Sequence, residues 1–69
     1  MRDTRPLSTP DQILNAALTK ERRSREFYAG LAEQCRIDTV RRLLEKLKDE
    51  ENKQVRMIED MLKDQARCE

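Results

Sequence analysis

The chain has 69 residues, of which 15 are Lys or Arg, 14 are Asp or Glu and none is His. This length allows one small domain at most, and with 36% apolar and 42% charged residues its core is thin, so we expect the chain to oligomerise. The absence of histidine excludes Ser-His-Asp and Cys-His catalysis, Cys2His2 zinc fingers and HExxH metal sites. The single glycine, Gly30, excludes a P-loop and a GxGxxG nucleotide fingerprint.

Net charge, hydropathy and cysteine spacing argue against several kinds of binding partner and site. A net charge of +1 argues against a protein that binds nucleic acid through bulk electrostatics. No apolar run approaches the roughly 18 residues of a membrane span, and the N-terminus has no signal-peptide pattern. Cys35 and Cys68 do not form a CxxC pair. These features predict a cytoplasmic protein with reduced thiols that binds neither nucleic acid nor a membrane.

The first predicted element follows a flexible N-terminal arm, residues 1–8. Thr9 is a good N-cap, Pro10 suits the first helical position, and Gln12 completes a capping box. From there a helix is predicted over about residues 10–35, with only Gly30 to weaken it.

The second predicted element is a helix over about residues 39–66, with Asp38 as its N-cap and no Gly or Pro inside it. Residues 67–69 form a tail. Two long helices joined by a short turn lie antiparallel. The fold class is therefore all-α, with one helical hairpin over residues 9–66.

Both helices carry a stripe of residues at alternating steps of three and four, which is typical of the a/d seam of a left-handed bundle. Phe27, Leu43, Val55 and Leu62 widen the apolar faces beside the two stripes. The stripe of the first helix is Leu14, Ala17, Glu21, Ser24, Tyr28, Leu31 and Cys35. The stripe of the second is Val40, Leu44, Leu47, Glu51, Gln54, Ile58 and Met61.

Both stripes are polar in the middle. Glu21 and Ser24 interrupt the first, and Glu51 and Gln54 interrupt the second. If the turn is centred near residue 37, Glu21 lies 16 residues before it and Glu51 lies 14 after it. At the rise of an α-helix both are roughly 21–24 Å from the turn. The two interruptions are therefore expected to form one polar layer.

The simplest cover for the apolar face is a second copy, so that two hairpins form a four-helix bundle around a two-fold axis. Glu21 and Glu51 of both copies then place four carboxylates in the interior. Buried charges of one sign need compensation, which two divalent cations would supply. Shared protons, or Lys20 and Arg25 reaching inward, are the alternatives.

Five segments of the chain resemble the ferritin-like and rubrerythrin-like superfamily, over about residues 12–62. The chain is most similar to the single-hairpin encapsulated ferritins, in which two chains share a di-iron site. The segments are Glu21-Arg-Arg-Ser-Arg-Glu-Phe27-Tyr28, Leu31-Ala32-Glu33, Leu44-Glu-Lys-Leu47, Glu50-Glu51-Asn-Lys-Gln54 and Ile58-Glu-Asp-Met61-Leu62.

The resemblance implies an iron-related site with Glu21 as a ligand, Tyr28 seven residues later, and Glu51 as the Glu of an ExxH motif. The ligand His of that motif is replaced by Gln54. A Gln carbonyl oxygen is an auxiliary ligand that binds Fe(II) more weakly than imidazole does. The cofactor is thus iron or another divalent cation, and the ferroxidase activity of the family is doubtful here. Ser24 and Glu50 lie near the same site.

A second function stays open from the same residues. The hairpin can be a non-catalytic assembly or interaction subunit that uses the Glu and Gln side chains as a metal-free polar network. The expected partner is a second copy in a homodimer, and a larger ring, a protein partner or a shell remains open.

Overall fold

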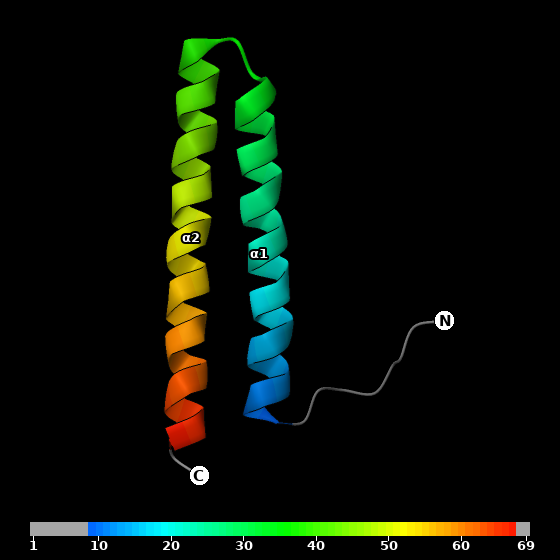
Figure 1. Cartoon of the computed structure of the whole chain (residues 1–69), viewed down its shortest axis with the longest axis vertical. Coiled ribbons are helices and arrows are strands. Elements are labelled where there is room, and N and C mark those ends of the chain that lie inside the picture. Colours follow the sequence, from blue (N-terminus) through cyan, green and yellow to red (C-terminus); the bar gives the residue numbers. More distant parts are fainter. Residues whose placement is uncertain (1–8, 68–69) are drawn as a thin grey trace, which may run out of the picture.

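The computed structural model describes the backbone of residues 9–67, which forms two antiparallel helices joined by a three-residue turn (Figure 1). Helix α1 spans Pro10–Gln34 and helix α2 spans Asp38–Arg67. The predicted all-α helical hairpin is confirmed, with Gln34, Asp38 and Arg67 each one residue from the predicted boundary. The predicted arm, residues 1–8, and residues 68–69 of the predicted tail lie outside the described part.

The start of α1 is fixed by the predicted capping box. Gln12 N–H donates to Thr9 Oγ1 at 3.1 Å, and Thr9 N–H donates to Gln12 Oε1 at 3.2 Å. Two backbone donors that the helix leaves unpaired are thereby satisfied. Pro10 takes the first turn, where its missing N–H costs nothing.

The start of α2 differs from the prediction. Asp38 is not the N-cap but the first residue of the helix, and the backbone carbonyl of Ile37 accepts the first hydrogen bond, from Arg41 N–H at 2.8 Å. The Asp38 carboxylate instead accepts from Arg41 Nη2 at 2.7 Å. An acidic residue in the first turn still interacts favourably with the helix dipole.

The line of closest packing between the helices runs beside the predicted stripes. The buried apolar residues are Leu18, Ala32 and Val55, with 6%, 8% and 2% of their surface exposed. Each directly follows a stripe member, and one residue turns the helix by about 100°. The stripes, predicted as the seams of a bundle, therefore border the contact line of the single hairpin, and all of their members are half-buried or exposed.

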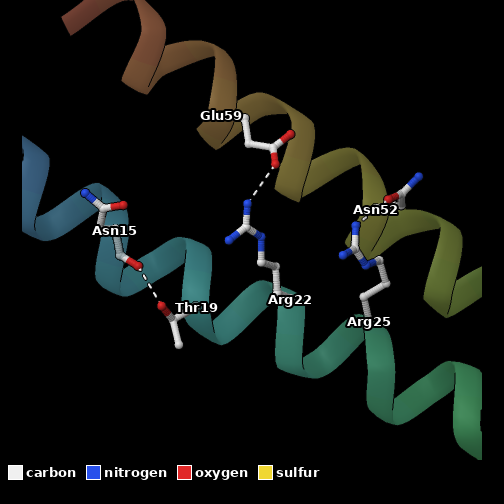
Figure 2. Close-up of polar contacts among 6 residues, drawn as sticks. All are labelled: Asn15, Thr19, Arg22, Arg25, Asn52 and Glu59. Carbon is white, nitrogen blue, oxygen red and sulfur yellow. Dashed lines mark hydrogen bonds and ion pairs between the residues drawn. The ribbon is translucent and has the colours of Figure 1, made fainter. Parts of the chain in front are cut away.

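Side-chain hydrogen bonds connect α1 and α2 along one side of the hairpin (Figure 2). Arg22 Nη2 donates to Glu59 Oε2 at 3.0 Å, and Arg25 Nη1 donates to Asn52 Oδ1 at 2.9 Å. Both contacts lie on the side of the Leu18–Val55 line away from the stripes. We call this polar side the back face.

The other side, which we call the front face, carries the two stripes and most of the exposed apolar surface. At 100° per residue the exposed large apolar side chains of both helices fall on this side or at its outer edge. They are Ile13, Phe27, Leu31, Val40, Leu43, Met57 and Met61, each at least 37% exposed. The turn residue Ile37 is 62% exposed as well. A single hairpin thus leaves uncovered the face that a bundle would bury.

Candidate functional site

Glu21 of α1 and Glu51 of α2 meet in the middle of the front face. The Glu21 side chain is only 19% exposed, and Glu51 is half-buried. A hydrogen bond with Glu21, burial and the negative charge of Glu21 raise the pKa of Glu51 above its ordinary value of 4.5. Glu50 acts in the same direction, and Lys20 opposes it. The two seam interruptions are therefore one carboxylate pair, as the helix rise predicts.

The two flanking cations do not neutralise this pair from within. Lys20 Nζ lies 3.7 Å from Glu21 Oε2, but the Lys20 side chain is 76% exposed. An ion pair this open to water contributes little. Arg25 turns to the back face and donates to Asn52, as Figure 2 shows. In the single hairpin, Arg25 therefore does not bind the carboxylate pair.

The remaining predicted site residues surround the pair at different depths. Ser24 and Tyr28 are half-buried on α1, and the Tyr28 ring contacts Phe27 edge-on with 5.5 Å between ring centroids. Gln54 lies about one turn of α2 beyond Glu51 and is exposed, as is Glu50. The auxiliary ligand of the predicted site is thus on the surface that a second copy would cover.

One hairpin supplies only part of a metal site. Within residues 9–67 no three Asp, Glu or Cys side chains are grouped to hold a metal ion. Glu21 and Glu51 give two carboxylates on one face, whereas divalent cations such as Mg²⁺ and Ca²⁺ take six or more oxygen ligands. If metal binds here, further ligands must come from a second copy or from water.

Other polar features lie away from this pair. A groove of about 320 Å³ at the turn end is lined by Ala29, Ala32, Glu33, Cys35, Arg41, Glu45 and Lys48. Its charges are mixed, and neither Glu21 nor Glu51 lines it. The Cys35 thiol donates to the Ile37 carbonyl oxygen at 3.5 Å, while Cys68 lies outside the described residues.

Comparison of the chain with known protein families, curated proteins and solved structures finds no match. Neither α1 nor α2 combines the length and the apolar character that a membrane crossing requires.

Proposed function

We propose that the chain is a ferritin-like metal-binding subunit, in which two copies pair through their front faces and share a carboxylate-rich site. The observation that carries this proposal is the meeting of Glu21 and Glu51 at the centre of an apolar face. Two acidic side chains held together at such a position repel each other, as the raised pKa of Glu51 reflects. A cation removes that repulsion.

The homodimer is supported by the surface that the hairpin leaves open. Three apolar residues are buried between the helices within the described residues, whereas seven large ones are exposed on or beside the front face. An exposed apolar patch bordered by polar residues is characteristic of an interaction site. In a pair of front faces, two copies of Glu21 and of Glu51 would supply four carboxylates for about two divalent cations.

The residues fit a hard cation better than a soft one. Glu21 and Glu51 offer carboxylate oxygens and Gln54 an amide oxygen, so the donor set is all oxygen. Manganese, magnesium, calcium or weakly held iron suits such a set, and a bound ion would supply charge neutralisation. With no imidazole ligand, we propose metal binding rather than fast ferroxidase catalysis, and Tyr28 as a neighbour of the site.

The experiment is a thermal-unfolding series of metal-stripped protein with Mn(II), Mg(II), Ca(II) and anaerobic Fe(II). Ligands that bind only the folded state raise the melting temperature. We expect at least one cation to do so in the wild type and not in Glu51→Gln. Glu45→Gln, which removes an exposed back-face carboxylate, is the matched control and should keep the shift. The absence of any shift across these cations would contradict the proposal.

A second function has support from Gln54 and from the raised pKa of Glu51. A protonated Glu51 can donate to Glu21, and Gln54 can donate to either, which makes a polar network that needs no metal. The hairpin would then be an assembly subunit whose polar layer fixes the register of the bundle. For this function the double change Glu21→Leu/Glu51→Leu leaves stability neutral or raised, because hydrophobic residues often replace buried polar clusters without loss.

A further inference from the structure

The outer edge of the front face carries one row of exposed residues on each helix. On α1 the row is Ile13, Lys20 and Phe27, and on α2 it is Leu43, Glu50 and Met57. Members of a row are seven residues apart, so they stack along one line of the helix. Both rows therefore read apolar, charged, apolar, and their central charges have opposite signs.

Two front faces can pair about a two-fold axis in two ways. In the same-end arrangement the axis runs along the bundle, both turns lie at one end, and each α1 packs beside α2 of the partner subunit. In the opposite-end arrangement the axis is perpendicular to the bundle at the level of Glu21 and Glu51. The turns then lie at opposite ends, and each helix packs beside its own counterpart.

Both arrangements bring apolar row members near apolar row members, so the charges decide between them. In the same-end arrangement Lys20 faces Glu50 of the partner subunit, offset by roughly 6 Å along the axis from helix rise. In the opposite-end arrangement Lys20 faces the partner's Lys20, and Glu50 faces the partner's Glu50, at a similar offset. Charges that flank a helical seam in this way set the orientation of the partner.

Side-chain size favours the same arrangement. The stripe positions that point most directly out of the front face are mostly small on α1, where they are Ala17, Ser24 and Cys35, with Tyr28 as the one large side chain. On α2 they include Leu47 and Met61. Packing α1 beside the partner's α2 sets the mostly small stripe against the mostly large one at both new contacts. The opposite-end arrangement sets small against small at one contact and large against large at the other, which fills space less evenly.

We propose that a second copy of the chain covers the front face in the same-end arrangement. Lys20 of each subunit then faces Glu50 of the partner subunit, and these two contacts, one on each side of the four carboxylates, fix the orientation. This rests on the proposed function for the pairing itself and adds its orientation. A two-fold axis along the bundle does not change the height of any residue. Glu21 and Glu51 of both subunits therefore lie at the same height, wherever the pair lies along the helices.

The test measures the distance between the two turns in the metal-free dimer. A single spin label is placed at the exposed turn residue in Cys35→Ser/Cys68→Ser/Arg36→Cys, and the label separation is measured by pulsed electron resonance in chelator-treated buffer. The same-end arrangement predicts labels within about 25 Å, since packed helices are 8–10 Å apart. The opposite-end arrangement places them more than about 40 Å apart by helix rise. A long distance, or a monomer at every concentration, overturns the inference.

A charge substitution gives an independent readout. Lys20→Glu turns both Lys20–Glu50 contacts repulsive in the same-end dimer, so we expect the dissociation constant to rise by roughly ten- to thirtyfold. In the opposite-end dimer it replaces a Lys pair by a Glu pair, and because Lys20 lies 3.7 Å from Glu21 the added charge weakens that dimer as well. The charge swap Lys20→Glu/Glu50→Lys separates the two arrangements, because it restores an opposite-charge contact with the partner subunit in the same-end dimer alone. Arg42→Glu makes the same charge change on the exposed back face and should leave dimerisation unchanged. A charge swap that fails to recover the dimerisation lost in Lys20→Glu, or equal effects of Lys20→Glu and Arg42→Glu, would contradict the inference.

These outcomes separate the inference from the proposed function. A short label distance with no cation binding refutes the metal function and keeps the orientation. A long distance with cation binding keeps the metal function and refutes the orientation.

Discussion

Glu21 and Glu51, thirty residues apart in the chain, hydrogen-bond across the hairpin, and this contact raises the pKa of Glu51. The pair lies where both apolar stripes are interrupted, with one carboxyl from each helix. A polar residue in the apolar stripe of one helix has many explanations. Because the polar residues of the two stripes contact each other, they form one carboxylate pair.

The first prediction concerns Glu51→Gln in metal-free protein. Because the pKa of Glu51 is raised on folding, the folded state binds more protons than the unfolded chain above the ordinary value of 4.5. Wild-type stability therefore falls as the pH rises from 4.5 through the raised pKa. Glu51→Gln removes the charge, so urea unfolding should show a smaller loss over this range and a higher stability at pH 7. A steeper pH dependence in the variant would contradict the assignment.

The second prediction concerns Leu43→Ala, which tests whether the front face is covered. Leu43 is 55% exposed on the hairpin, so its loss should change the stability of a monomer by less than about 0.5 kcal/mol. In a dimer that buries it, the change costs about 1–3 kcal/mol per copy, and sedimentation equilibrium should show weaker association. Arg42→Ala, the neighbouring residue on the back face, should leave association unchanged. Association that responds equally to both changes would contradict the assignment of the interface.

The third prediction concerns the capping box at Thr9. Thr9→Ala removes the acceptor for Gln12 N–H and should lower the free energy of unfolding by about 0.5–2 kcal/mol. Thr9→Ser keeps a hydroxyl at the cap and should retain most of that stability. Thermal unfolding followed by circular dichroism measures both, and a loss of equal size in the two variants would point to a cause other than the cap.

The fourth prediction concerns Gly30 in α1. A Cβ atom added at Gly30 meets nothing within 4 Å, and the backbone there has a negative φ. Gly30→Ala should therefore raise the free energy of unfolding by about 0.5–1 kcal/mol, because alanine loses less conformational freedom in a helix. Chemical denaturation measures the gain. A destabilised variant would indicate that this position is covered in the assembled protein.

Features set by local sequence could be predicted well. The capping box depends on residues three apart, and the height of Glu21 against Glu51 depends only on helix rise and a short turn. The rotation of each helix about its axis could not be predicted in the same way. Leu18 and Val55 are buried between the helices, and each lies one residue, or about 100° of helix rotation, beyond the stripe members Ala17 and Gln54.

The role of Asp38 at the start of α2 also differs from the prediction. Its residue type suits an N-cap, yet Arg41 is placed to bind its carboxylate from within the first turn. The two outer rows lie outside the a/d positions, so the stripe pattern does not include them. The seven-residue spacing from Ile13 to Lys20 to Phe27 is visible in the sequence and is the signal that finds the row.

We propose that the Glu21–Glu51 pair belongs to a metal site that a second copy completes. The most direct test is equilibrium dialysis of the dimer against Mn(II), and anaerobically against Fe(II), followed by elemental analysis of wild type and Glu51→Gln. We expect about two tightly held ions per wild-type dimer, whose charge four carboxylates would neutralise, and none in the variant. No retained ion in the wild type, or the same number in both proteins, would contradict it.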